Sequence, residues 1–194
     1  MNNYDRMTHS VGSLAMRTLG VPISALRCLT RTLRGMRHHI RTAYGDSDTF
    51  YSGTDDEPLQ GGGQGNPGAP PMWVAITIIL VRILAMYAPG CVIISSLSLI
   101  TLSFSAIMYV DDTDLFVVGK TPKESITSIV DRSKDLVDIW CRSIWATGGL
   151  LIPDKCYWYL IGFKWTGSKW EYVRKTDIES TISIDDQFGN PQEV

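Results

Sequence analysis

Residues 101–112 read TLSFSAIMYVDD and end in Tyr109-Val110-Asp111-Asp112, where two carboxylates stand side by side at the end of a long apolar stretch. Two such charges about 4 Å apart repel by about 4 kcal/mol at an effective dielectric constant near 20, unless a cation or water intervenes. The pair must therefore be either solvated or bound to metal. Which of these applies depends on how the chain folds around the pair.

Side chains before the two aspartates alternate with a period of two. The even positions from 102 to 110 are apolar, and the odd positions from 101 to 111 are mostly hydroxylated or polar, with Ile107 as the exception. This period predicts a β-strand. An unbroken strand would turn Asp112 into the apolar face, where a carboxylate is costly. We therefore expect a turn at or near Asp111-Asp112, a returning strand over residues 115–118, and both acids at the tip of a hairpin.

The apolar stretch upstream raises the question of a membrane span. Met72–Met86 is apolar almost all round, but it is shorter than the about 20 residues that a span requires and carries Arg82 at its centre. With Pro70 and Pro71 at its start, it predicts a buried core helix. Residues 91–108 carry no charge, but their six hydroxyls and period of two favour strand structure. A small membrane protein using residues 72–108 is the weaker alternative.

The first quarter of the chain is basic, although the net charge of the whole is only -2. Seven arginines lie between Met1 and Tyr44, against the single acid Asp5. Ser24–Ile40 reads as an amphipathic helix with leucines on one face and Arg27, Arg31 and Arg34 on another. That arginine face is either a solvated surface or a contact surface for nucleic-acid phosphates.

Further elements follow from local signals. Residues 42–52 predict a short hairpin with its turn at Gly45–Asp48, and Thr121-Pro122-Lys123-Glu124 predicts the capped start of a long helix that Gly148-Gly149 ends. We expect a turn at Leu150–Cys156, an aromatic hairpin from residues 157–163 and 165–173, and a polar tail. The glycine-rich loop at residues 61–68 contains a literal GxGxxG, but it lacks the preceding strand and following acid of a dinucleotide site.

Cysteine and histidine usage indicates no structural metal site. The four cysteines show no CxxC spacing, and His38 and His39 have no partner at ligand spacing. No N-terminal signal sequence is recognisable. We expect one main domain with appendages, in a reducing intracellular setting; whether nuclear or cytoplasmic stays open.

The order of these motifs resembles the palm of reverse transcriptases, and most closely that of retroelement polymerases. A Gln64-Gly65-Asn66 loop precedes an apolar helix, Tyr109-Val110-Asp111-Asp112 follows on a hairpin tip, and a helix then leads to Pro153-Asp154-Lys155. The resemblance covers roughly residues 3–165 as a partial palm domain, and leaves residues 166–194 as a hairpin and polar tail. It implies an α+β fold in which an antiparallel sheet packs on helices, a ferredoxin-like core that is here incomplete.

The resemblance also implies roles for seven residues. It implies that Asp111 and Asp112 hold Mg²⁺ or Mn²⁺ and that Lys155 protonates the leaving pyrophosphate. The nucleotide and template would lie against Gln64, Gly65, Asn66 and Tyr109. The implied activity is RNA-directed DNA polymerase, with dNTPs, a DNA primer and an RNA or DNA template as partners and with no membrane.

One departure from the family concerns its first motif. Tyr4-Asp5-Arg6 is similar to the second half of that motif, so the third metal-binding aspartate would precede Met1. The family's polymerase segments upstream and downstream are also missing. We therefore expect a fragment that is inactive alone. The alternative is a non-catalytic nucleic-acid-binding or interaction remnant that uses the Arg27, Arg31 and Arg34 face.

Overall fold

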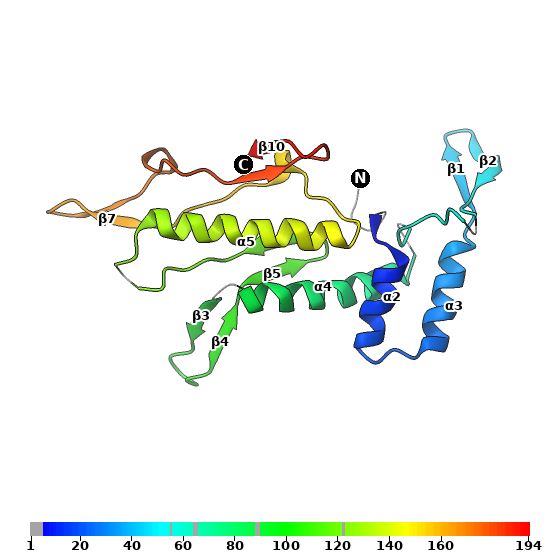
Figure 1. Ribbon diagram of the computed structural model, residues 1–194, viewed down its shortest axis with the longest axis horizontal. Helices are drawn as coiled ribbons and strands as arrows, with labels where there is room; N and C mark the ends of the chain where they lie inside the picture. The colour runs from blue at the N-terminus through cyan, green and yellow to red at the C-terminus, as the bar shows by residue number, and fades with distance from the viewer. Residues whose placement is uncertain (1–5, 55, 64–65, 88–89, 122) are drawn as a thin grey trace. The chain divides into compact units, whose positions relative to one another are not determined.

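The computed structural model describes residues 6–54, 56–63, 66–87, 90–121 and 123–194. Within them, helices alternate with short antiparallel strand pairs (Figure 1), which confirms a mixed α+β class. The described strands form separate two-stranded sheets. By its internal contacts the chain divides into two compact units, Met1–Ile79 with Ala146–Gly149 and Leu80–Trp145 with Leu150–Val194.

The first unit contains the helices α2 (His9–Thr18) and α3 (Ile23–Arg34), which lie side by side (Figure 1). Leu26 and Leu33 on α3 are buried, as the leucine stripe predicts. Gly12 on α2 leaves space for Met72, because a Cβ built on the glycine would lie 2.3 Å from the methionine Sδ. The core of this unit therefore depends on a close helix approach at Gly12.

The helix predicted over Ser24–Ile40 is shorter than expected. It ends at Arg34, and the Gly35 N–H donates to Arg31 O at 2.9 Å. Glycine has a low helix propensity, so a glycine after the last buried leucine is a natural end. Residues 38–40 instead belong to strand β1 (His38–Thr42), where the His38 ring stacks on Tyr51 with 5.0 Å between centroids.

The hairpin predicted over residues 42–52 is present, but its turn lies earlier than expected. Strand β1 pairs antiparallel with β2 (Gly45–Tyr51), and Thr42 is opposite Gly45. The connection is therefore Ala43 and Tyr44. The prediction of a turn at Gly45–Asp48 was wrong. Gly45, with a φ of 123°, follows the two-residue turn and is already the first residue of β2.

Helix α4 (Ala69–Tyr87) starts three residues before the predicted Met72 and is only partly buried. Met72, Ile76 and Leu84 are at most 2% exposed, whereas Val74 and Met86 are 54% and 78% exposed. The prediction of a buried core helix thus holds for one side of it. Among the described residues it is the one helix whose length and mean hydropathy, 1.9, would allow a membrane crossing.

The second unit combines one long helix with short hairpins. Its core comes from α5 (Ile126–Ala146), through Val130, Leu136, Trp140 and Ile144, and from Val173, Ile182 and Ile184 near the C-terminus. The strands pair as β3 (Cys91–Ile94) with β4 (Thr101–Phe104), β5 (Ala106–Tyr109) with β6 (Asp112–Leu115), β7 (Phe163–Trp165) with β8 (Trp170–Tyr172), and β9 (Ser183–Asp185) with β10 (Pro191–Glu193).

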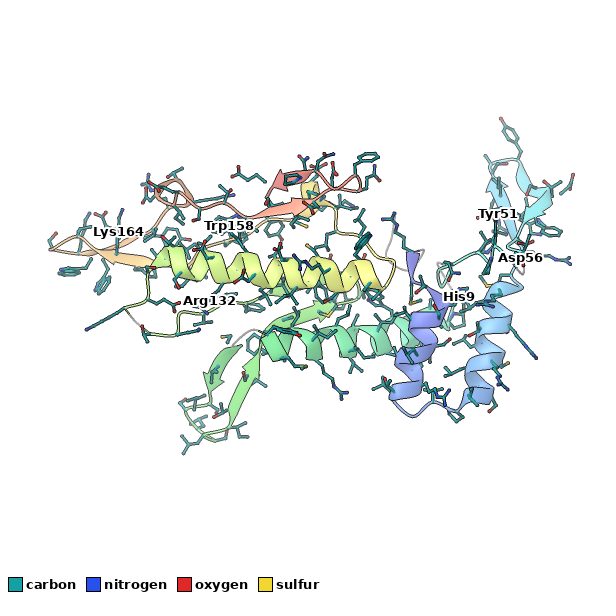
Figure 2. All side chains as sticks on the ribbon, viewed as in Figure 1. His9, Tyr51, Asp56, Arg132, Trp158 and Lys164 are labelled. Carbon is teal, nitrogen blue, oxygen red and sulfur yellow. The ribbon has the colours of Figure 1, made fainter. Side chains whose placement is uncertain are left out.

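Helix α5 begins later than the predicted capping box. Its first residue is Ile126, and the hydroxyl of Ser125 accepts the Ser128 N–H at 3.2 Å, as an N-cap does. The Glu124 carboxylate instead accepts the Lys120 N–H and pairs with Arg132 on α5 at 2.8 Å (Figure 2). The pKa of Glu124 is lowered, mainly by the hydrogen bond from the Lys120 N–H and further by the pair with Arg132. Pro122 lies outside the described residues.

Residues 157–194 are more structured than the predicted hairpin and polar tail. The aromatic hairpin is present but shorter than predicted, because residues 157–162 form no strand. Beyond it, the β9–β10 hairpin buries Ile184, and Val194 O accepts the indole N–H of Trp158 at 2.9 Å (Figure 2). The turn predicted around Pro153 is the short 3-10 helix η1 (Pro153–Lys155), and another, η2 (Lys175–Asp177), follows β8.

Candidate metal hairpin and glycine-rich loop

The two adjacent aspartates lie at the tip of the β5–β6 hairpin. Tyr109 is opposite Asp112 and Met108 is opposite Thr113, so Val110 and Asp111 form a two-residue turn. The predicted hairpin is confirmed, but the returning strand is Asp112–Leu115 instead of residues 115–118. The strand predicted to run unbroken from Thr101 is interrupted at Ser105, which is 5% exposed and whose carbonyl accepts the Phe116 N–H at 2.9 Å.

After the two-residue turn, exposed and half-buried side chains alternate again along β6, and Asp112 is on the exposed face. Met108 and Thr113 are half-buried, whereas Tyr109 and Asp112, which form the neighbouring pair, are exposed. Because the turn takes up two residues, Asp112 lies on the exposed face and avoids the apolar face that an unbroken strand would give it. Both carboxylates are thus available from solvent.

The backbone of the turn is strained at Val110. Its φ is 59°, in the left-handed region, which is unusual for a β-branched residue. A two-residue hairpin turn with positive φ at its first central position favours glycine there. Holding a non-glycine residue in this region costs about 1–3 kcal/mol, and such strain concentrates at functional sites. Leu99, in the connection between β3 and β4, has a similar φ of 55°, so the strain at Val110 supports a functional constraint only together with the two adjacent acids.

The charges at the tip are uncompensated. Within the described part of the chain, the side-chain carboxylate of neither Asp111 nor Asp112 forms a hydrogen bond or an ion pair, and both residues are exposed. Asp114 follows two residues later on the same exposed face of β6. No group of three His, Cys, Asp or Glu side chains among the described residues is arranged to hold a metal ion. Asp111 and Asp112 thus offer two hard oxygen ligands and leave the other coordination positions open.

Lys155 is exposed at the end of η1, in the same unit as the aspartates. Its backbone N–H donates to Ile152 O at 3.0 Å, which closes the turn. Its side chain forms no hydrogen bond or ion pair with described residues, and no such interaction joins it to Asp111 or Asp112. The lysine is therefore free to approach an anionic ligand.

The glycine-rich loop leads into α4 in the first unit. Gln64 and Gly65 lie outside the described residues. The Asn66 side chain accepts the Gly68 N–H at 2.9 Å and donates to Met36 Sδ at 3.6 Å. Asn66 thus holds the turn that starts α4, a structural role that the sequence did not suggest.

His9 anchors this loop, and sequence reasoning missed it. It is 1% exposed, its Nε2 lies 2.6 Å from Gly61 O, and its backbone N–H donates to the Gln60 side chain at 3.0 Å (Figure 2). Met7 O accepts the Gly61 N–H at 2.8 Å in addition. The described residues provide no partner for the buried Nδ1. A lone histidine at the start of a helix gives no sequence signal for such a contact.

Comparison with protein-family models, with curated proteins and with solved structures finds no match to this chain. The functional interpretation therefore depends on the residues and geometry of the chain itself.

Proposed function

We propose that this chain is part of a reverse-transcriptase palm, an RNA-directed DNA polymerase domain that transfers nucleotides in a template-directed reaction. The observation that carries the proposal is the tip of the β5–β6 hairpin, where Asp111 and Asp112 are adjacent, exposed and unpaired among the described residues. The strained Val110 beside them supports it, because a hairpin needs neither a strained valine nor two adjacent acids to form.

The donor set fits Mg²⁺ or Mn²⁺. Mg²⁺ prefers hard oxygen ligands and uses one or two carboxylates together with waters and substrate phosphates. Two bound ions would lower the pKa of the primer hydroxyl and neutralise the triphosphate. Asp111 and Asp112 would orient these ions, and Tyr109, exposed beside Asp112, would contact the nucleotide or template.

The other proposed roles belong to residues away from the hairpin. Lys155 carries an unpaired ammonium group that would protonate the leaving pyrophosphate. Gln64, Gly65 and Asn66 would lie against the incoming nucleotide and the template. Of these three, Asn66 is described, and its side-chain bonds would fix the loop in place. The palm domain is proposed to cover residues 3–165, and its core would be the ferredoxin-like sheet of such polymerases.

Metal binding that depends on nucleotide tests the proposal. We expect the purified chain to bind Mn²⁺ more tightly when dNTP is present, because triphosphate oxygens supply ligands that two carboxylates leave open. Electron paramagnetic resonance of free Mn²⁺ measures this. Asp111→Asn should remove the dNTP effect, while Asp135→Asn, an exposed acid on α5, should not. An equal dNTP effect in wild type and Asp111→Asn would refute the assignment.

Primer extension separates a complete from an incomplete polymerase. We expect the chain alone to show little template-dependent incorporation with Mg²⁺ or Mn²⁺, because no third acidic, histidine or cysteine side chain among the described residues joins Asp111 and Asp112 in a group that could hold a metal ion. Clear incorporation that Asp111→Asn abolishes would contradict this expectation and assign the whole activity to the chain. Nucleic-acid binding without any dNTP-dependent metal binding would favour the non-catalytic alternative.

A further inference from the structure

A groove of about 440 Å³ runs between α2 and α3 in the first unit. Four arginines line it, Arg17 from the last turn of α2 and Arg27, Arg31 and Arg34 from α3. All four side chains are exposed. The hydroxyls of Ser13 and Thr30, 3.1 Å apart, join the two helices across it. The groove is thus formed by two elements and is more than one face of a helix.

The positive charge of this groove is uncompensated. The sequence contains no Asp or Glu from Arg6 to Gly45. In the part of the chain that the structure describes, none of the four groove arginines forms an ion pair, whereas Arg41 and Arg132 elsewhere do. Clustered cations without nearby anions raise the local potential and attract anionic ligands.

The arginines on α3 form a row along the helix axis. Positions 27, 31 and 34 are separated by rises of about 6 and 4.5 Å, so the row is about 10 Å long. Each strand of a nucleic-acid duplex carries one phosphate per about 3.4 Å of helix axis. A row of cations matches such a repeating polyanion better than a single phosphate group. The planar guanidinium also binds phosphate oxygens in a bidentate manner.

Apolar side chains lie between the arginines. Leu14 and Ile23, which are 64% and 47% exposed, and the buried Leu26 line the same groove. An apolar lining contacts sugar rings without demanding hydrogen bonds, and it lowers the dielectric constant beside the cations, which strengthens arginine–phosphate pairs.

We infer that this arginine groove binds the phosphodiester backbone of a nucleic acid. The inference goes beyond the proposed metal site, because it uses none of its residues and requires no metal. It assigns binding to a groove shared by α2 and α3, including Arg17 and Leu14, and not to the α3 face alone.

The salt dependence of binding tests the arginine row. The full chain is titrated, in EDTA, against a fluorescein-labelled 20-base-pair DNA duplex of mixed sequence at several KCl concentrations, with anisotropy as the signal. Each phosphate contact adds about 0.9 to the slope of log affinity against log salt, so R27Q/R31Q/R34Q should lower the slope by about 2 to 3. K120Q/K123Q/R142Q removes the same charge from exposed positions elsewhere and should change it by less than about 1. An unchanged slope in the first variant, or an equal fall in the second, overturns the inference.

Two further variants test the groove itself. R27K/R31K/R34K keeps the charge and should keep the slope, but it should weaken binding several-fold because the guanidinium fork is lost. Leu14→Glu places a carboxylate in the groove and should weaken binding, while Leu19→Glu, exposed but outside the lining, should not. Circular dichroism confirms that each variant is folded. Wild-type binding by folded Leu14→Glu contradicts the groove.

Competition identifies the ligand class. Unlabelled duplex should displace the probe at least about tenfold better than polyglutamate of equal charge, because bidentate pairing and sugar contacts add to simple charge. Equal displacement overturns the nucleic-acid assignment in favour of an acidic polypeptide. D111N/D112N should bind the duplex as wild type does. Failure of the metal-site proposal therefore leaves this inference standing, and its own failure leaves the metal site untouched.

Discussion

Two hairpins of this chain, β1–β2 and β5–β6, have connections of the same length but differ in which residue adopts a positive φ. In β1–β2 the positive φ, 123°, falls on Gly45, directly after the connection. In β5–β6 a φ of 59° falls on Val110, inside the connection. Glycine adopts positive φ without a steric penalty, whereas a β-branched residue does not.

The same two hairpins also treat their acids differently. In β1–β2, Asp46 is held by Arg41 with a nitrogen–oxygen distance of 2.6 Å across the strands. In β5–β6, Asp112 is opposite Tyr109, which offers no charge. The first hairpin thus has glycine at its positive φ and a cation beside its acid. The second departs from it in both strain and charge, and such departures are expected where function constrains the sequence.

Giving β5–β6 the ion pair of β1–β2 should have the largest effect. Tyr109→Arg places a guanidinium opposite Asp112, as Arg41 is close to Asp46. We expect Mn²⁺ affinity to fall about 30-fold, or about 2 kcal/mol, because the arginine competes with the metal for the carboxylate and its positive charge repels the divalent ion. Isothermal titration calorimetry measures it. Tyr109→Gln, which adds no charge, should retain most of the affinity; equal loss in both variants would show that Tyr109 itself matters instead.

Giving β1–β2 the strain of β5–β6 should be the next largest effect. Gly45→Val places a β-branched residue at a φ of 123°. We expect the opening free energy of this hairpin, from amide hydrogen exchange, to fall by about 1.5 kcal/mol. Thr49→Val in the same strand is the control, since β2 accepts β-branched residues there. Unchanged protection in Gly45→Val would mean that positive φ is not costly at hairpin ends in this chain.

The sequence predicted elements where local and tertiary signals agree. A helix period fixes which residues share a face, and the apolar stripe of α5 is Ile126, Ile129, Val130, Leu136, Val137, Trp140, Ile144 and Trp145. Val130, Leu136, Trp140 and Ile144 are buried as the stripe predicts, whereas Trp145 at its end is 74% exposed. The alternation of apolar and polar residues over positions 101–111 likewise predicted that the two aspartates lie at a hairpin tip. Both predictions concern periodic patterns, which sequence displays directly.

Boundaries and isolated contacts were not predictable in this way. Residues 35–40 follow the helical pattern of α3, yet Gly35 ends the helix and His38 pairs in β1, because glycine is about 1 kcal/mol less favourable than alanine inside a helix. His9 packs on Gly61, which is 52 residues away in the chain. Contacts of that kind depend on tertiary packing and leave no periodic trace in the sequence.

Relieving the strain of β5–β6 should have a smaller effect than adding strain to β1–β2. Val110→Gly should raise the opening free energy of β5–β6 by about 1 kcal/mol, because relief of strain exceeds the entropy that glycine loses on folding. Val110→Ala, which keeps a Cβ, should lie between glycine and wild type. Amide exchange of β5–β6 measures both. Lower protection in Val110→Gly would show that the valine side chain stabilises the turn by contacts that outweigh its strain.

The smallest expected effect is the acid sensitivity of β1–β2. The hydrogen bond from Arg41 lowers the pKa of Asp46 below its ordinary value of 3.8. A carboxylate whose pKa is lowered by folding stabilises the folded state above the unfolded value, and this stabilisation is lost as pH falls through the folded pKa. Amide protection of β1–β2 should therefore be constant above about pH 4 and decline below pH 3.8. Carboxyl NMR titration gives the pKa directly.

Arg41→Gln should return the Asp46 pKa toward 3.8 and remove the decline that the ion pair causes. Arg37→Gln is the matched control, since Arg37 lies over the Phe50 ring at 4.6 Å and forms no ion pair with Asp46. Both groups of the pair are exposed, so the stabilisation is small and falls further in high salt. A lowered Asp46 pKa that persists in Arg41→Gln would mean that other groups stabilise the carboxylate. The contrast with the unpaired Asp112 would then depend on strain alone.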